Sequence, residues 1–473
     1  MVTPFIKLFK SPKSKYFYDV GRNEIVMITD ELYDVLSQIE SGSASWQDIT
    51  INPSEELMML LDAGYLSCKH PSRIRHPYID TFQFFLDRKL GMITLQITQD
   101  CNFRCKYCVY SEHNYKKQRS HSKKTMSWET AKKAIDFYFS HSLDSASRNI
   151  GFYGGEPLLQ FELVKRIIEY AEQKAQGKLL SFNMTTNGSL LTDGVVGFLA
   201  AHNVRLLISI DGHQETHDRN RVLKNGAGTY NLIMNRIAYI KEQYPDYFQK
   251  IHINTVIDTT NDFDSMIEFG SELKGLPSEN IQFNYIDNSD GAVFYSEENL
   301  MKAEYHAFLA YLSLCRKYPE DKLSALGTQR VQEFKTEYQN IKSSHDLPDE
   351  FGHGGPCIAG KSRLLITTDG FFYPCERVNE SPHMCIGNLK TGFDNESIRR
   401  LLSIGELTSE QCISCWAIRH CSICAKLCDN GNALSADEKL RHCEGSRQNA
   451  EQKLRSIILQ SEMAYRYGTE ALN

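Results

Sequence analysis

Three cysteines lie within a single short stretch, CNFRCKYC, at residues 101–108. The stretch follows an alternating apolar segment, so the three thiols are expected on a loop at the end of a strand. Structural zinc sites take four protein ligands, commonly from two separated Cys-x2-Cys pairs. A four-iron cluster that is held by three thiolates instead keeps one iron free for an exogenous ligand. The spacing favours such a cluster over a zinc knuckle that borrows a distant fourth ligand.

The distribution of the cysteines supports metal ligation over disulfide bonding. The chain has 473 residues and 14 cysteines. Eleven of them fall into two groups, whereas Cys68, Cys315 and Cys385 are counted apart. The first group is the three at residues 101–108, and the second is Cys357, Cys375, Cys412, Cys415, Cys421, Cys424, Cys428 and Cys443. The first segment is cationic but lacks an apolar core of the kind found in export signals, so we expect a cytoplasmic protein with reduced thiols.

The bulk composition excludes two classes of partner. Net charge is -6, with 24% charged residues, which provides no basic field for nucleic acid or an anionic membrane surface. The chain contains no uninterrupted apolar run of about 18 residues. We therefore expect neither a nucleic-acid-binding nor a membrane protein.

Six strand candidates alternate with amphipathic segments from residue 91 onward. They are MITLQIT, NIGFY, LLSFNMTT, VRLLISI, KIHINTVI and IQFNYI. Strands that alternate with helices favour a parallel sheet with right-handed crossovers, and six units predict a partial (β/α)6 barrel similar to a TIM barrel. The short motifs GGEP, TNG and SIDG follow the second, third and fourth strands. They would therefore share one end of the barrel with the first cysteine group.

The first 80 residues predict a separate strand-plus-helix module of winged-helix size. Residues 15–28 read as two strands around a turn, and amphipathic helices follow, one capped by Thr29 or Asp30 and one ending at Gly64. DNA binding is disfavoured because the helix that would enter a groove carries acidic residues and no Lys or Arg. An exposed strand edge that accepts an extended peptide fits this module better.

The motifs CNFRCKYC, YGGEPLL and SIDGHQETHDRNR, in this order, resemble the radical S-adenosylmethionine (SAM) superfamily. The resemblance implies a [4Fe-4S] cluster on Cys101, Cys105 and Cys108, with SAM chelating the fourth iron. It further implies a set of SAM-binding residues: Tyr107 near the adenine, Gly154 and Gly155 at a close backbone approach, Glu156 at the methionyl ammonium, and Ser209 and Arg221 at the ribose and carboxylate. For Arg221, a solvated ion pair with Asp218 is the open alternative.

The second cysteine group is similar to the SPASM extension of this superfamily, which carries up to two auxiliary [4Fe-4S] clusters. Carried over to this chain, auxiliary cluster II is implied on Cys412, Cys415, Cys421 and Cys443, and cluster I on Cys357 and Cys375. The spacing departs from the family pattern after Cys421. Either Cys424 or Cys428 completes cluster I, or cluster I keeps an open iron.

The resemblance extends to maturases of ribosomally made peptides, in particular those that form thioether crosslinks. It implies a Cys-containing precursor peptide with a leader and an external electron donor of flavodoxin or ferredoxin type. Glu376 follows Cys375 and could deprotonate the donor thiol, or it could be a salt-bridged glutamate. Carbon–carbon crosslinking, formylglycine formation and, outside enzymes, electron carriage are the alternatives that the residues leave open.

These observations predict five regions. They are residues 1–80 (leader recognition), 90–295 (radical SAM partial barrel), 296–350 (helical bridge), 351–450 (auxiliary clusters) and 451–473 (C-terminal helix).

Overall fold

The structure is a computed structural model. It describes residues 3–110, 121–175, 177–258, 262–286, 296–341 and 347–467. Within these ranges, none of the helices combines the length and the hydropathy that a membrane crossing requires. The last six residues of the predicted C-terminal helix, 468–473, lie outside the described part.

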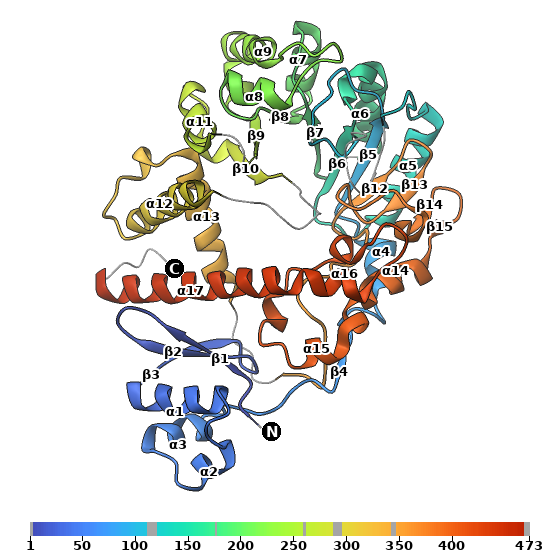
Figure 1. The fold of residues 1–473 in the computed structure, drawn as a ribbon. Coiled ribbons are helices and arrows are strands. Elements are labelled where there is room, and N and C mark those ends of the chain that lie inside the picture. The colour runs from blue at the N-terminus through green and yellow to red at the C-terminus, as the bar shows by residue number, and fades with distance from the viewer. Residues whose placement is uncertain are drawn as a thin grey trace.

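Six parallel strands form the wall of an incomplete barrel, as predicted (Figure 1). Their bounds are β5 Met92–Thr98, β6 Arg148–Gly154, β7 Leu180–Thr186, β8 Arg205–Ser209, β9 His252–Ile257 and β10 Ile281–Tyr285. They pair in chain order, each with the next. Because the carboxyl ends of parallel strands share one edge, the motifs that follow β5 to β8 meet there.

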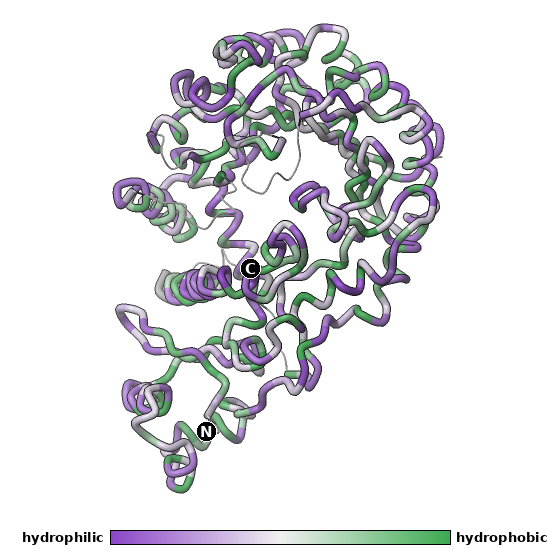
Figure 2. Tube along the Cα trace, turned by 45° about the vertical axis from the view of Figure 1, so that its right-hand side comes forward, coloured by the Kyte–Doolittle hydropathy of each residue, from purple (hydrophilic) through white to green (hydrophobic). Residues whose placement is uncertain are grey.

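Helices cover the outer face of these strands. They are α4 Phe82–Arg88, α5 Trp128–His141, α6 Phe161–Ala175, α7 Asp193–Ala201, α8 Gln214–Asn220, α9 Tyr230–Gln243, α10 Pro245–Phe248 and α11 Phe263–Glu268. In α5, Ser127 caps the first turn, and Ala131, Ala134, Ile135 and Tyr138 form its buried stripe. Figure 2 shows hydrophilic and hydrophobic residues alternating along such helices, as the amphipathic pattern requires.

The barrel sheet continues into the second cysteine region, which the sequence did not predict. Strand β12 (Leu364–Ile366) pairs in parallel with β5, and β13 (Phe371–Tyr373), β14 (Gly387–Asn388) and β15 (Gly392–Phe393) follow as antiparallel strands. All three residues of β12 are buried. The cysteine-rich region therefore shares a ten-stranded sheet and a core with the barrel.

The N-terminal residues form a three-stranded antiparallel sheet with helices on one face. The elements are β1 Ile6–Lys10, β2 Lys15–Asp19, β3 Glu24–Ile28, α1 Asp30–Glu40, α2 Trp46–Ile51 and α3 Glu55–Asp62. Thr29 caps α1 by accepting a hydrogen bond from the Leu32 amide, as expected. Strand β1 was not predicted. The sheet order is β1-β2-β3, so β1 and β3 are its edge strands.

The remaining elements connect the barrel to the N-terminal sheet. They are β4 Arg73–Ile74, which pairs with β11 Glu350–Phe351, and helices α12 Glu297–Leu314, α13 Ala325–Asn340, α14 Asn395–Leu402, α15 Ser409–Ile413, α16 Ala436–Arg441 and α17 Cys443–Tyr467. Helix α17 begins at Cys443, earlier than the predicted start at residue 451. It passes between the barrel and the N-terminal sheet (Figure 1).

Candidate functional site

The structure brings together the first three cysteines on the loop after β5. Burial, with smaller contributions from Glu156, Cys105 and Cys108, raises the pKa of the Cys101 thiol to about 12, against the Phe103 amide, which lowers it. Burial also raises the pKa of Cys105 to about 11, while Arg221 opposes this shift and Cys108 adds to it. Cys101 is influenced by both other thiols and Cys105 by Cys108, so the three thiols lie close to one another.

The donor set fits an iron–sulfur cluster. In the part of the chain that the structure describes, no three His, Cys, Asp or Glu side chains converge on one metal ion. A four-iron cluster does not need its ligands to converge on one point, because each cysteine thiolate binds a different iron. Three neighbouring thiols on one loop suit that arrangement, and Asn187 Nδ2 lies 3.8 Å from Cys101 Sγ as a donor to the sulfur.

Gly154 and Gly155 hold the loop that leads into Cys101. A Cβ added at Gly154 would lie 2.2 Å from the Thr98 carbonyl oxygen, and one at Gly155 would lie 2.0 Å from the Asp100 carbonyl oxygen. The Gly155 amide donates to Thr98 O at 2.8 Å, and the Glu156 amide donates to Asp100 O at 2.9 Å. The close approach that these glycines permit in this structure is therefore to the chain before Cys101.

Replacing Gly155 with alanine is expected to dislodge this loop, because the added Cβ meets backbone atoms that cannot rotate away. We expect a loss of about 1–3 kcal/mol in the free energy of unfolding and less iron bound per chain after anaerobic reconstitution. Thermal unfolding and iron analysis measure the two effects. Gly194→Ala is the matched control, because its Cβ would meet no atom within 4 Å. Wild-type iron content in Gly155→Ala would contradict this role.

The Glu156 carboxylate is fully buried and held by its own chain. Oε1 accepts hydrogen bonds from the Leu158 amide at 3.0 Å and from Thr186 Oγ1 at 2.8 Å, and Oε2 accepts one from the Asn187 amide at 2.8 Å. Burial raises its pKa, and these donors oppose the rise. A carboxylate has about four acceptor positions, so one remains for a ligand such as the predicted ammonium group.

Asn187 is the asparagine of the TNG motif, and the sequence alone indicates no role for it at this site. Besides its contact with Cys101, Nδ2 donates to Asn102 Oδ1 at 2.9 Å, and its Oδ1 accepts from both the amide and the hydroxyl of Ser189. The motif after β7 therefore supports the cysteine loop after β5.

Arg221 is buried beside the cysteine loop. Nη1 donates to the Tyr107 hydroxyl at 2.7 Å, and that hydroxyl donates to Asp211 Oδ2. The Nε atom of Arg221 is buried without a partner. An unpaired buried donor is costly, so this geometry suits an anionic ligand. Tyr107 thus holds Arg221 through its hydroxyl, a contact that the sequence did not predict.

The alternative ion pair of Arg221 is not formed in this structure. Asp218 Oδ1 instead accepts hydrogen bonds from the amides of Thr229 and Tyr230, at 2.7 and 2.9 Å, at the start of α9. Ser209 ends β8 and is buried two residues before Asp211. Its predicted contact with the SAM ribose stays a prediction.

His217 is a second residue that the sequence reasoning missed. Its Nδ1 accepts from the Asp211 amide at 3.2 Å, and its Nε2 donates to Thr229 Oγ1 at 2.9 Å, which donates to the carbonyl of Arg221. Burial, aided by Arg221, lowers the pKa of His217 to about 2. The neutral imidazole therefore positions the backbone on either side of the site.

The later cysteines form two sets. In the first, burial raises the pKa values of Cys357 and Cys375, and Cys424 raises both further. In the second, burial raises those of Cys415 and Cys443, and Cys412 and Cys421 raise both further. The second set, Cys412, Cys415, Cys421 and Cys443, is the one that the resemblance assigns to auxiliary cluster II.

Cys428 is fully buried and is influenced by members of both sets. Burial raises its pKa to about 12, with smaller contributions from Cys424, Cys421 and Cys443. Cys424 raises the pKa values of both Cys357 and Cys375, whereas Cys428 is not among the main causes of either shift. This pattern favours Cys424 over Cys428 as the neighbour of Cys357 and Cys375, and its place in cluster I stays a prediction.

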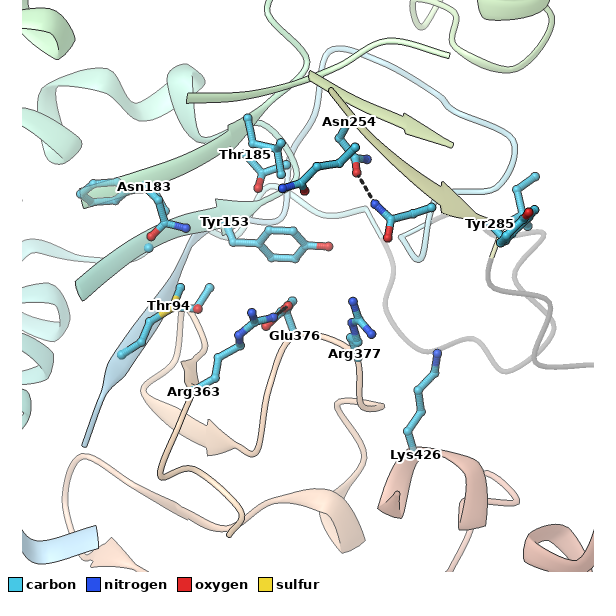
Figure 3. Close-up of a pocket in the computed structure, with 17 residues that line it drawn as sticks. Thr94, Tyr153, Asn183, Thr185, Asn254, Tyr285, Arg363, Glu376, Arg377 and Lys426 are labelled. Carbon is cyan, nitrogen blue, oxygen red and sulfur yellow. Dashed lines mark hydrogen bonds and ion pairs between the residues drawn. The ribbon is translucent and has the colours of Figure 1, made fainter. Parts of the chain in front are cut away.

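A cavity of about 660 Å³ lies between the inner face of the barrel strands and the cysteine-rich region (Figure 3). Barrel residues line one side and the loops of the later cysteines line the other: Thr94, Tyr153, Asn183, Thr185, Asn254 and Tyr285 face Arg363, Glu376, Arg377 and Lys426. Within the described part of the chain, three buried polar atoms on this lining have no hydrogen-bond partner, namely Thr94 Oγ1, Asn183 Oδ1 and Glu376 Oε2. A polar ligand would satisfy them.

Glu376 lies on the cavity wall beside Cys375. Its Oε1 forms an ion pair with Arg363, and its Oε2 is the buried, unpartnered atom. The ion-paired alternative from the sequence is thus realised at one oxygen, whereas the other oxygen is buried with no hydrogen-bond partner among the described residues. The carboxylate also raises the pKa of Cys375, after burial.

The loop between Cys415 and Cys421 also carries the N-terminal sheet. Arg419 Nε donates to Val20 O at 2.6 Å and Nη2 donates to Gly21 O at 2.8 Å. The Phe9 ring makes an edge contact with Trp416, with ring centroids 6.5 Å apart. The loop between the two predicted cluster ligands Cys415 and Cys421 is therefore also the loop that contacts the N-terminal sheet.

Replacing Arg419 with alanine is expected to loosen the N-terminal sheet, because two carbonyls lose their charged donor at a cost of about 1.5–3 kcal/mol. Hydrogen exchange of the amides of β2 and β3 should accelerate, while that of β5 to β8 stays unchanged. Arg419→Lys keeps the charge and is expected to fall between alanine and wild type. Unchanged exchange in β2 and β3 would contradict this role.

Known proteins are similar to this chain in sequence and in fold. The Radical SAM superfamily model matches residues 95–270. The radical SAM cyclopropyl synthase TigE of Paramaledivibacter caminithermalis is 23% identical over 348 residues, which cover 71% of this chain and 67% of that protein. The serine-type anaerobic sulfatase-maturating enzyme of Bacteroides thetaiotaomicron is 30% identical over 188 residues, which cover 39% of this chain and 43% of that protein.

A solved structure has a similar fold over most of the chain. Native anSMEcpe with bound AdoMet superposes with a TM-score of 0.57 at 18% identity, covering 81% of this chain and 100% of that one. At this identity the likeness bears on the fold alone.

Proposed function

This chain carries a radical SAM domain, and from that premise we propose that it is a peptide maturase that oxidatively modifies a cysteine-containing precursor peptide. The proposal rests mainly on the cavity between barrel and cysteine-rich region, with the unpartnered Oε2 of Glu376 on its wall. The relatives named above support it, since one of them is a sulfatase-maturating enzyme and the structurally similar anSMEcpe has been solved with a bound peptide.

We assign the cofactor-binding residues as follows. Cys101, Cys105 and Cys108 would hold the first [4Fe-4S] cluster, and Arg221 Nε and Glu156 would pair with the carboxylate and the ammonium of SAM. Cys412, Cys415, Cys421 and Cys443 would hold one auxiliary cluster, and Cys357, Cys375 and Cys424 would supply three ligands of another. When bound, the first cluster and SAM supply a 5'-deoxyadenosyl radical that removes hydrogen from carbon.

We propose thioether formation as the reaction. Joining a cysteine sulfur to carbon removes one hydrogen atom from the carbon, one proton from the thiol and one electron. The 5'-deoxyadenosyl radical would take the hydrogen atom, and an oxidised auxiliary cluster would take the electron. Glu376 Oε2 is placed to accept the proton, because it is buried on the cavity wall and no other group uses it. Cys357, Cys375 and Cys424 would leave one iron of their cluster without a protein ligand. That iron could bind the sulfur of the substrate cysteine.

Formylglycine formation is the second candidate. Structures of anSMEcpe superpose on this chain, one of them with bound AdoMet and the Cp18Cys peptide at a TM-score of 0.55 and 18% identity. An acidic residue after Cys375 suits a base for either reaction. Carbon–carbon bond formation, as in the named cyclopropyl synthase, is the third outcome that an experiment must separate.

We assign leader recognition to the N-terminal sheet. Within the described residues, β3 pairs on one side only, with β2. Met27 on β3 and Met58 and Met59 on α3 are exposed apolar side chains. An edge strand beside apolar side chains suits an extended peptide that adds a fourth strand. A flavodoxin or ferredoxin would deliver the electron that starts the reaction.

Co-expression with candidate precursor peptides under anaerobic conditions tests the function. A thioether makes the peptide lighter by two hydrogens and protects its cysteine from alkylation. An aldehyde that reacts with hydrazines identifies the formylglycine reaction. A two-hydrogen loss with a free cysteine identifies carbon–carbon bond formation. No modification of any peptide by a fully reconstituted enzyme would contradict the maturase function.

A further inference from the structure

Lys439 is a fully buried lysine on helix α16, among the later cysteines. Its Nζ donates to the carbonyl oxygens of Ile404 at 2.9 Å and Gly405 at 3.4 Å, and it lies 3.6 Å from Cys412 Sγ. All three ammonium donors are thus directed at two carbonyls and one sulfur.

No carboxylate balances this charge. In the described ranges, no ion pair joins Lys439 to an Asp or Glu side chain. Burial of an ammonium group is costly unless an anion compensates for it. Carbonyl oxygens supply only partial charge, so the sulfur of Cys412 is the one contact that can become a full anion.

Lys439 contacts two members of the second cysteine set. The Cys443 thiol donates to the Lys439 carbonyl at 3.6 Å, while the side chain reaches Cys412. The ammonium lowers the pKa values of Cys443 and Cys428, in each case against the larger effect of burial. The positive charge therefore acts on several thiols of one region.

The other donors to sulfur in this set are neutral. The Thr408 hydroxyl lies 3.3 Å from Cys412 Sγ, and Ser446 Oγ donates to Cys421 Sγ at 3.5 Å. Arg447 also acts on Cys415 and Cys443, but it forms an ion pair with Glu444 near the surface. Among the described residues, Lys439 is the fully buried cation that contacts the second cysteine set, Cys412, Cys415, Cys421 and Cys443.

We propose that Lys439 is a positioning residue that supplies the counter-charge of the auxiliary cluster on Cys412, Cys415, Cys421 and Cys443 and raises its reduction potential. The inference rests on the proposed cofactors, because it needs a cluster on these cysteines. Net charge and hydrogen bonds to sulfur set the potential of iron–sulfur clusters, and a nearby cation favours the more negative, reduced form. The cluster would then accept an electron more readily.

Potentiometric titration of the reconstituted enzyme, followed by electron paramagnetic resonance, tests this assignment. Lys439→Met removes the charge but keeps the length of the side chain. We expect the reduction equilibrium of one cluster to become at least tenfold less favourable, which is about 59 mV for one electron. Lys439→Arg should stay near wild type, and Thr408→Val should shift the same signal less. Lys165→Met, at the ion pair with Glu162 on α6, is the control and should cause no shift.

Two results would overturn the inference in different ways. A normal iron content with an unchanged potential in Lys439→Met refutes the role of Lys439 and leaves the cofactors intact. Wild-type enzyme that binds iron only at the first site refutes the auxiliary cluster itself. If the neutral variants of Lys439 fold incorrectly, the same question is tested on wild-type enzyme labelled with 15N-lysine. A lysine nitrogen coupled to a reduced cluster in electron–nuclear double resonance supports the proposal, and no such coupling refutes it.

Discussion

Replacing Glu376 with glutamine is expected to lower peptide modification by about 10²–10⁴-fold, the usual contribution of a general base. Glutamine keeps the shape of the side chain but cannot accept the thiol proton at neutral pH. Release of 5'-deoxyadenosine in the absence of peptide should stay at the wild-type rate, because Glu376 lies on a cavity wall to which the first cysteine loop contributes no residue. Product analysis by mass spectrometry and nucleoside analysis by chromatography measure both quantities in one sample.

Two variants make this prediction specific. Glu376→Asp keeps a base and should recover part of the activity. Glu410→Gln changes an exposed carboxylate on α15 and should leave the rate at the wild-type value. Equal loss of nucleoside release and of peptide product in Glu376→Gln would instead assign Glu376 to structure.

Replacing Arg221 with glutamine is expected to weaken SAM binding by about 2–5 kcal/mol, on the order of 30- to 3000-fold. The guanidinium is buried, its Nε has no partner, and the Tyr107 hydroxyl and Asp211 carboxylate depend on it. Its loss would leave the ligand carboxylate and the buried Asp211 without a cation. Calorimetric titration of reconstituted enzyme with SAM measures the change.

Arg219→Gln is the matched control, because Arg219 lies two residues away and is 45% exposed in its weak pairing with Glu215. It should bind SAM as wild type does. Iron content must be equal in both variants, so that a loss of affinity is not a loss of the cluster. Wild-type affinity in Arg221→Gln would contradict the assignment of Arg221 to the SAM carboxylate.

The barrel could be predicted because its strands are long and apolar. Strand β5 is buried along nearly its whole length, and turn residues or short motifs follow β5, β6, β7 and β8 in the sequence. Strand β12 could not be predicted, because three residues show no periodicity. Its pairing with β5 joins two regions that the sequence presents as separate.

The types of the site residues could be read from the sequence, but their partners could not. Tyr107 and Arg221 are 114 positions apart, and only the fold shows that one hydroxyl joins Arg221 to Asp211. Position 155 must be glycine because a side chain there would collide with the backbone of Asp100. The GGEP motif alone does not reveal this contact. Lys439 lies in a charged segment that is typical of solvated helices, yet it is fully buried. Tertiary packing decides each of these contacts.

Release of 5'-deoxyadenosine from SAM on reduction tests the central claim most directly. The measurement compares reconstituted wild-type enzyme with the variant in which Cys101, Cys105 and Cys108 are all replaced by alanine. Wild-type enzyme should release the nucleoside under strong reductant, and the triple variant should release none while keeping the iron of the later cysteines. Equal release by both proteins, or none by wild-type enzyme with a full complement of iron, would contradict the account.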